Sequence, residues 1–67
     1  MSIIKIIEVL ATSEKSFDDA AQQAVAEASK SVKNLKSIYI KEMNGKIENN
    51  RIVSYGVNAK ITFTVDN

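Results

Sequence analysis

Residues 51–65 read RIVSYGVNAKITFTV, and this stretch decides the fold. Its odd positions from Val53 to Val65 are apolar, whereas the even positions from Ser54 onward carry small or polar side chains. An alternation with period two predicts a β-strand. At about 3.3 Å per residue the strand spans about 50 Å, whereas a compact chain of this length has a radius of gyration of about 11 Å. We therefore expect the strand to wrap around something, or to project beyond its own core and be covered by a neighbouring subunit.

Length and composition predict a single domain, residues 1–67, which needs a source of stability in addition to its own hydrophobic core. A chain this short buries only about 60% of the surface that its unfolded form exposes. The absence of cysteine excludes disulfides and thiolate metal sites, and the absence of histidine excludes imidazole ligands. Association of subunits is the additional source of stability that remains.

The charge balance argues against nucleic-acid and membrane partners. Nine basic and eight acidic residues give a net charge of +1, which is too balanced to indicate attraction to nucleic acid or to an anionic membrane. Three of the four aromatic side chains fall on helix-facing or core-facing patterns, and no apolar stretch approaches the length of a membrane span. We expect a cytoplasmic protein.

The stretch at residues 3–10, IIKIIEVL, predicts a second strand, because it is short and rich in β-branched residues. Both of its faces are largely apolar. One face carries Ile3, Lys5, Ile7 and Val9, and the other carries Ile4, Ile6, Glu8 and Leu10. A three-stranded sheet with one helix covers only one of these faces, which is a second indication of assembly.

A connection at residues 11–15 leads into an amphipathic helix. Ser16 begins the pattern S-x-x-D with Asp19, a capping box, although Thr12 or Ser13 offers a cap one turn earlier. From Phe17 we expect a helix of about 16 residues. Its apolar stripe consists of Phe17, Ala21, Ala24, Val25, Ala28 and Val32.

The charges of this helix follow its dipole. Asp18 and Asp19 fall in the predicted first turn and Lys30 and Lys33 in the predicted last turn, which is the favoured arrangement. Asn34 is a residue that can end the helix. Because the stripe is mostly alanine, the helix can approach a sheet closely.

Residues 35–43, LKSIYIKEM, alternate as a further strand. The alternation predicts one face of Leu35, Ser37, Tyr39, Lys41 and Met43, and an opposite face of Lys36, Ile38, Ile40 and Glu42. Asn44-Gly45 predicts a turn, and the polar residues 46–50 predict a longer loop. The fold class is therefore α+β, β-α-β-β, with a three-stranded antiparallel sheet wrapped around one helix.

The residues available for chemistry predict a protein that is not an enzyme. Without histidine or cysteine the common catalytic triads cannot be built. A serine-lysine pair stays formally open, but eight lysines and seven serines bring some pairs together by chance. Oxygen clusters occur at Glu48-Asn49-Asn50 and at Glu14, Asp18 and Asp19. We interpret the first cluster as a solvated loop and the second as helix capping.

The sequence resembles the dodecin family over nearly its whole length. The match consists of the opening strand, the segment ATSEKSFDDAAQQAVAEA at residues 11–28, and a short second strand with Glu42 near its end. It ends with a long last strand that begins with Ser54-Tyr55. The resemblance implies a subunit whose sheet wraps its helix and twelve copies of which form a hollow spherical shell. The excess strand length and the two apolar faces of residues 3–10 agree with such a shell.

The resemblance also implies a ligand pocket, formed here by Lys36, Ser37, Glu42 and Gly56. In flavin-binding members a tryptophan of the second strand stacks on the flavin, and a glutamine of the third strand hydrogen-bonds its ring. These positions correspond to Ser37 and Gly56, and the chain has no tryptophan. Tyr39 is no simple replacement, because two residues of strand displace it by about 6.6 Å.

Two functional hypotheses follow from the resemblance. The first is a homo-dodecameric shell that binds or sequesters a small ligand. That ligand is a flavin (riboflavin, FMN or lumichrome), bound weakly, or a metal ion such as Ca²⁺ or Mg²⁺ held at Glu42. Some members without the tryptophan are associated with calcium. The alternative is a structural assembly with no physiological ligand.

Overall fold

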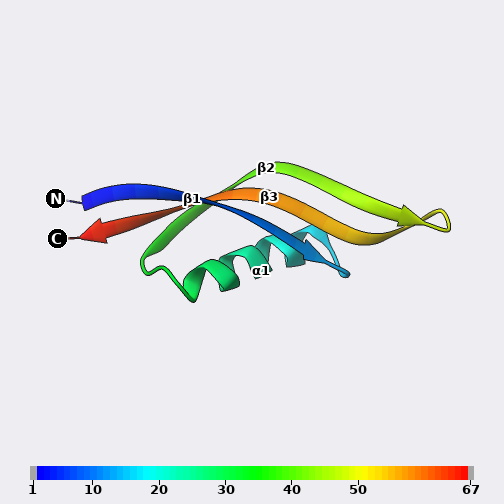
Figure 1. The fold of residues 1–67 in the computed structure, drawn as a ribbon, viewed down its shortest axis with the longest axis horizontal. Helices are drawn as coiled ribbons and strands as arrows, with labels where there is room; N and C mark the ends of the chain where they lie inside the picture. The colour runs from blue at the N-terminus through cyan, green and yellow to red at the C-terminus, as the bar shows by residue number, and fades with distance from the viewer. Residues whose placement is uncertain (1, 67) are drawn as a thin grey trace.

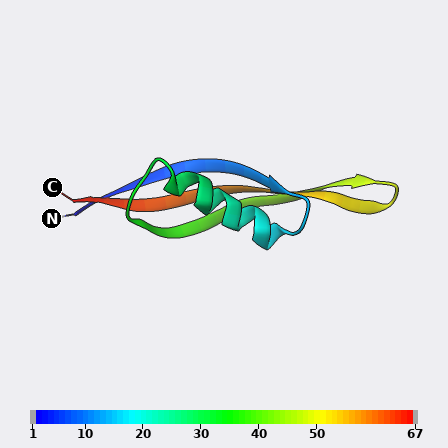
Figure 2. The same ribbon diagram turned by 90° about the horizontal axis from the view of Figure 1, so that it is seen from below.

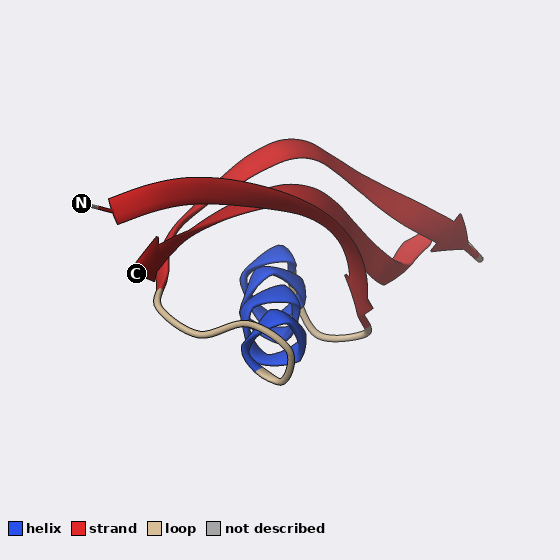
Figure 3. Ribbon diagram, turned by 60° about the vertical axis from the view of Figure 1, so that its left-hand side comes forward, coloured by secondary structure: helices blue, strands red, loops and turns tan. Residues whose placement is uncertain are grey.

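The computed structural model describes residues 2–66 as three strands and one helix: β1 (Ser2–Ser13), α1 (Phe17–Ser29), β2 (Leu35–Glu48) and β3 (Arg51–Asp66). The strands form one antiparallel sheet in the order β1-β3-β2, which arches over the helix (Figures 1 and 3). The predicted β-α-β-β fold is confirmed. Met1 and Asn67, which the predicted domain includes, lie outside the described residues. The described part of the chain contains no helix long and apolar enough to cross a membrane.

The core lies between α1 and the face of the sheet that covers it, which we call the concave face; the opposite face is the convex face. On β3 the predicted apolar positions Val57, Ala59 and Ile61 are buried. On α1 the buried side chains are Ala20, Ala24 and Ala28. Alanine keeps the helix close to the sheet, as the sequence predicts. Ala20 was not in the predicted stripe, although it lies one turn before Ala24 on the same face.

The helix begins where the sequence predicts. Ser16 is the N-cap residue, and its Oγ accepts a hydrogen bond of 2.9 Å from the backbone N–H of Asp19. This bond satisfies one of the amide groups that the first turn leaves without a partner. The capping alternatives at Thr12 and Ser13 are excluded, because both residues belong to β1.

The helix ends earlier than the sequence predicts, at Ser29 rather than near Val32. The backbone N–H groups of Lys30 and Ser31 donate to carbonyls three residues earlier, at 3.2 and 3.1 Å. Such bonds tighten and terminate a last turn. Lys30 is therefore the C-cap residue and Lys33 lies beyond the helix, so the predicted basic last turn is wrong.

The turn between β2 and β3 lies at Asn49-Asn50, not at Asn44-Gly45. Both asparagines have positive φ angles, 54° and 63°, as a two-residue hairpin turn of type I′ requires. Gly45 instead lies within β2 and has no positive φ. A Cβ at Gly45 would lie 3.2 Å from Cγ2 of Ile52, so the glycine serves close packing between the two strands.

Irregularities in the ladder change which residues share a face. Three residues without a cross-strand partner shift the register between β2 and β3: Lys36 and Lys41 on β2, and Val53 on β3. Each extra residue of a bulge reverses the alternation that follows it. The predicted faces of residues 35–43 are therefore wrong. Leu35, Ile38, Ile40 and Met43 lie opposite concave-face residues of β3, while Ser37, Tyr39, Glu42 and Asn44 lie on the convex face.

The β2–β3 hairpin projects past the end of α1 (Figures 1 and 2). The molecule measures 52 × 19 × 13 Å, and its radius of gyration of 13.8 Å exceeds the roughly 11 Å of a compact chain of this length. The long strand thus does both things that its length predicts: it arches around the helix, and it extends beyond the core. Met43, Ile47 and Ile52 of this hairpin are half or more exposed.

Candidate functional site

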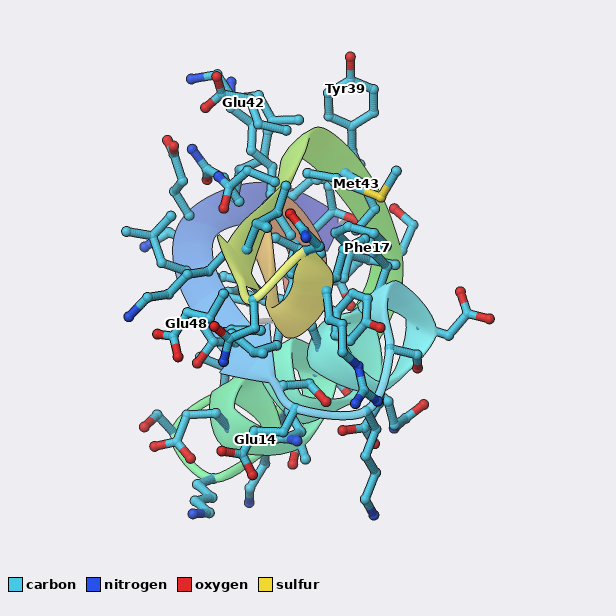
Figure 4. All side chains as sticks on the ribbon, turned by 90° about the vertical axis from the view of Figure 1, so that its right-hand side faces the viewer. Glu14, Phe17, Tyr39, Glu42, Met43 and Glu48 are labelled. Carbon is cyan, nitrogen blue, oxygen red and sulfur yellow. The ribbon has the colours of Figure 1, made fainter. Side chains whose placement is uncertain are left out.

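Three of the four pocket residues predicted from the resemblance lie on the convex face of the sheet. Cross-strand neighbours on this face form four rows from β2 through β3 to β1. The rows are Ser37-Thr62-Ile6, Tyr39-Lys60-Glu8, Glu42-Asn58-Leu10 and Asn44-Gly56-Thr12. Figure 4 shows Tyr39 and Glu42 pointing away from the helix. No side chain of α1 can reach these rows, because the sheet separates them from the helix.

Ser37 offers a small polar surface. Its hydroxyl is hydrogen-bonded to the hydroxyl of Thr62, its neighbour on β3, and both belong to an exposed part of the face. A planar ring placed here would rest on two hydroxyl groups and find no aromatic partner at this position. Tyr39, one row away, is 66% exposed.

Lys36 is the extra residue of the first bulge in β2. Together with Ser37 it lines an open groove of about 180 Å³ beside the helix, whose other walls are Val25, Leu35, Ile38 and Ile61. The bulge thus separates Lys36 from the convex rows that hold Glu42 and Gly56.

Gly56 leaves a gap that a neighbouring amide fills. The position that a Cβ on Gly56 would take lies 2.9 Å from Oδ1 of Asn44 on β2. Gly56 has no positive φ, so its backbone conformation does not require glycine. The consequence of the missing side chain is space, and the Asn44 side chain occupies it.

Ser37 and Gly56 of one chain cannot hold the same small ligand. Ser37 lies opposite Thr62, and Thr62 is six residues along β3 from Gly56. That separation is about 20 Å, longer than a flavin ring system. A pocket that uses both positions needs a second chain.

Glu42 lies beside an unsatisfied amide. Asn58 of β3 donates through Nδ2 to Oε1 of Glu42 at 3.4 Å, which is a long hydrogen bond. Oδ1 of Asn58 is buried and has no hydrogen-bond partner. Within residues 2–66 no three acidic side chains come together in a way that could hold a metal ion. Glu42 therefore belongs to no such acidic group within the described residues.

The second oxygen cluster near the helix start has a structural role. Oδ2 of Asp19 accepts hydrogen bonds from Oγ of Ser13 at 2.6 Å and from Nε2 of Gln23 at 2.7 Å. These bonds, with a smaller contribution from the charge of Lys15, hold the pKa of the Asp19 carboxyl below its usual value. The Asp19 carboxylate thus ties the end of β1 to the first turns of α1 and accepts from side chains, while the free amide of the first turn is capped by the Ser16 hydroxyl.

Sequence reasoning missed Asn44, Asn58 and Thr62 as neighbours of the predicted site. Their contacts depend on which residues of β2 and β3 lie opposite each other, and three irregularities fix that register. The alternation within each strand carries no information about it. The signal that existed was the run of polar side chains at the even positions of β3.

Along β1 the convex face is largely apolar, apart from Glu8 and Thr12. Ile4, Ile6 and Leu10 are 69%, 60% and 78% exposed. The register confirms the two predicted faces of β1, with Ile7 opposite buried Ile61 and Ile6 opposite Thr62 on the other side. The helix covers only the concave face.

Comparison with solved structures places this architecture among dodecins. A crystal structure of an arginine-to-alanine variant of the Thermus thermophilus dodecin has a TM-score of 0.93, 28% identity and 100% coverage of both chains. The dodecin from Streptomyces coelicolor has a TM-score of 0.90 and 26% identity, over 98% of this chain and 94% of that one. A comparison with curated protein sequences finds no match.

A more distant likeness concerns a protein described as a calcium dodecin. This calcium-chelating antigen of Mycobacterium tuberculosis has a TM-score of 0.81 and 23% identity, over 96% of this chain and 91% of that one. At that identity the likeness shows a shared fold.

The fold and its convex face define a class of small βαββ proteins in which a curved sheet covers one helix and leaves its outer face open. Within that class the family assignment is direct. The dodecin family model matches residues 3–66, and the chain belongs to the dodecin family.

Proposed function

We propose that this protein is the single-domain subunit, residues 1–67, of a hollow homo-dodecameric shell that binds or sequesters a small ligand. Membership of the dodecin family supports the proposal. The role is binding rather than catalysis, since the chain has no histidine or cysteine. The proposal places the shell in the cytoplasm without nucleic-acid or membrane partners, and the net charge of +1 agrees with that.

The observation that carries the assembly is the exposed apolar side of β1. Leu10 alone is 78% exposed, and Ile6 and Ile4 lie further along β1 on the same face. Burying a side chain of this size contributes about 1.5–3 kcal/mol. A second copy of the chain is the partner that a chain of 67 residues needs to complete its core.

The ligand in this proposal is a flavin-type molecule (riboflavin, FMN or lumichrome) or a metal ion such as Ca²⁺ or Mg²⁺. Flavin binding is weaker than in members with the stacking tryptophan, because Ser37 offers a hydroxyl and Gly56 offers no side chain. Stacking on an aromatic ring contributes about 1–3 kcal/mol, which corresponds to roughly one to two powers of ten in affinity.

The second candidate function is a structural shell with no physiological ligand. The contacts made by Ser37 and Gly56, the two positions that the resemblance assigns to the flavin, favour this function. Ser37 is already hydrogen-bonded to Thr62, and Asn44 already occupies the space beside Gly56. Within one chain, the Ser37 hydroxyl therefore already has a hydrogen-bond partner, and the space beside Gly56 is already filled.

Light scattering of the purified protein tests the assembly, with an expected mass of twelve times the 7.4 kDa subunit. Leu10→Lys places a charge on the apolar side of β1 and is expected to dissociate the shell. Lys30→Leu, at an exposed helix C-cap, is the control with the opposite change in charge. A monomeric wild-type protein at micromolar concentration refutes the shell.

Absorbance and metal analysis of the purified shell separate the two candidate functions. A yellow colour, or bound calcium that survives dialysis, supports the ligand-binding shell. A shell of full mass that takes up none of riboflavin, FMN, lumichrome, Ca²⁺ or Mg²⁺ supports the structural alternative.

A further inference from the structure

The Asn44-Gly45 pair lies within β2 and forms no turn, although its sequence predicts one. Both residues are exposed, at the point where the β2–β3 hairpin leaves the helix (Figure 1). An asparagine followed by glycine can also react with its own backbone, because the side-chain amide and the next backbone nitrogen are close enough to close an imide ring. Whether the folded chain permits this depends on where that nitrogen points and on how the side chain is held.

The backbone nitrogen of Gly45 points away from β3. The carbonyl oxygen of Asn44 lies 3.6 Å from the position of a Cβ on Gly56, its cross-strand neighbour. The carbonyl oxygen of Ser54 lies 3.6 Å from the position of a Cβ on Gly45. Both carbonyls thus point into the ladder, so Asn44 and Ser54 belong to hydrogen-bonded pairs. Such pairs alternate with non-bonded ones in an antiparallel ladder, which makes Gly45 opposite Tyr55 a non-bonded pair.

The N–H of Gly45 is therefore directed to the outer edge of β2. The strand order β1-β3-β2 leaves that edge without a partner strand in the described part of the chain. Backbone groups at such an edge are not held in a ladder. Because Gly45 has no Cβ, no side chain shields its nitrogen either.

The side chain of Asn44 is exposed and rests over the backbone of Gly56. Its Oδ1 lies 2.9 Å from the position that a Cβ on Gly56 would take. Since its cross-strand neighbour has no side chain, nothing on that side holds the Asn44 amide in one rotamer. The carbon that would be attacked and the nitrogen that would attack it are thus both accessible.

This part of the hairpin has little apolar burial to hold the extended backbone in place. Met43 and Ile47, on either side of the pair, are 60% and 68% exposed. Segments with few buried apolar contacts open at a low free-energy cost. A brief opening lets the backbone at Asn44 rotate until Cγ of its side chain meets the Gly45 nitrogen.

We propose that Asn44 is a modification site, at which the backbone nitrogen of Gly45 displaces ammonia from the side-chain amide. The nitrogen loses its proton and bonds to Cγ of Asn44, which closes a succinimide ring, and the Cγ–Nδ2 bond breaks as ammonia leaves. Water then opens the ring. Opening at Cγ gives aspartate, and opening at the main-chain carbonyl gives isoaspartate. The net reaction takes up water, releases ammonia and needs no other reactant.

The products change the hairpin in two ways. Either one adds a carboxylate to the convex face, one row from Glu42. Isoaspartate also routes the main chain through the former side chain and lengthens it by one atom, which disturbs the ladder beyond Asn44 as an inserted residue does. The inference goes beyond the proposed shell and depends on neither its assembly nor its ligand.

Peptide mass spectrometry of the intact protein, incubated at mildly alkaline pH and then digested, tests the site. Trypsin separates the asparagines into the peptides EMNGK (42–46), IENNR (47–51) and IVSYGVNAK (52–60). The deamidated fraction of peptide 42–46 is expected to exceed that of the other two by more than about tenfold. Asn58 is the internal control, because β3 is paired on both sides and Ala59 carries a Cβ. An undigested sample taken at time zero corrects for reaction during the digest.

Two variants separate the roles of the two residues. Gly45→Ala shields the nitrogen and is expected to slow the reaction by about tenfold or more. Because its Cβ would lie 3.2 Å from Cγ2 of Ile52, circular dichroism checks that the variant folds. Asn44→Gln keeps the amide but lengthens the side chain, so the imide ring closes less readily and peptide 42–46 should stay unmodified.

Hydrogen exchange resolved to single amides tests the geometry by itself. The Gly45 amide is expected to exchange faster than that of Lys46, whose partner Ser54 directs its carbonyl into the ladder. Equal protection of the two amides would refute the edge position of the Gly45 nitrogen. A folded protein whose peptide 42–46 stays unmodified, while a urea-unfolded sample reacts, overturns the site, as do equal rates in all three peptides. None of these results bears on the mass of the shell, so light scattering decides that proposal separately.

Discussion

Phe17 and Tyr55 meet edge to face, with ring centroids 5.0 Å apart and an angle of 81° between the ring planes. Phe17 is the first residue of α1, and Tyr55 lies on β3 opposite Gly45. A Cβ on Gly45 would lie 4.0 Å from Cζ of Phe17. The ring pair therefore closes the core at the point where the hairpin leaves the helix, and glycine gives it room.

Replacing one ring of this pair is expected to destabilise the protein. Tyr55→Leu loses the edge-to-face contact, which contributes about 0.5–1.5 kcal/mol beyond the buried area. Urea unfolding followed by circular dichroism measures the change, at one protein concentration because an oligomer's stability depends on it. Tyr39→Leu is the control, since Tyr39 is largely exposed. Equal losses in the two variants would contradict the role of the ring pair.

The Asp19 carboxylate is expected to contribute stability that depends on pH. Hydrogen bonds from Ser13 and then Gln23 lower its pKa in the folded protein. A folded pKa below the unfolded value of about 3.9 means a stabilisation that is fully present above pH 4 and lost as the pH falls through the folded pKa. Asp19→Asn should therefore lower the Tm at pH 7 and have a smaller effect at pH 3.

The control for this titration is Asp18→Asn, at an exposed position of the same helical turn. Both variants lose a negative charge near the helix N-terminus, but only Asp19 accepts the bonds from Ser13 and Gln23. The same difference in Tm at pH 7 for both would assign the effect to the helix dipole alone.

A charge at Val57 is expected to prevent folding. Val57 is 3% exposed and lies between Ala11 and Met43 on the concave face. Burying an unpaired carboxylate there costs several kcal/mol, a large part of the stability of a small domain. Val53→Asp makes the same change at a bulge that is 37% exposed. Far-UV circular dichroism should show loss of structure for the first and retention for the second.

Flavin binding is expected to appear when the two family side chains are restored. Ser37→Trp supplies a ring for stacking and Gly56→Gln supplies an amide, so affinity for riboflavin should rise by about one to two powers of ten. Quenching of flavin fluorescence measures it. Submicromolar riboflavin binding by the unmodified protein would instead assign the stacking to another ring, such as Tyr39.

The order of elements could be predicted from the sequence because each has a local signal. The alternation of β3 and the cap at Ser16 depend on residues close together in the chain, and both predictions are confirmed. The hairpin shows the limit of such signals. Asn44-Gly45 is the stronger turn motif, but Asn49-Asn50 forms the turn. Gly45 is explained by its contact with Ile52 and by the nearby ring of Phe17, which no local pattern reveals.

The candidate site was less predictable, because it depends on the register between strands. The resemblance marked Glu42 and Gly56, but the alternation placed Glu42 with Ile38 and Ile40. The bulge at Lys41 puts it on the other face, next to Asn58. A bulge leaves one residue without a cross-strand partner, and the amino-acid composition of the strand does little to indicate where it occurs. The neighbours Asn44 and Asn58 followed only from the structure.

The two free edges of the sheet differ in regularity, with a consequence for handling the protein. The outer edge of β2 is interrupted at Lys36 and Lys41, and bulges and lysines hinder the addition of a further strand. β1 pairs without interruption from Ser2 to Ser13, so its other edge is a long, regular row of backbone groups beside apolar side chains. Such an edge templates intermolecular β-structure. Subunits released by dilution or mutation are therefore prone to aggregate through β1, and any assembly that covers this edge also acts as protection against fibre formation.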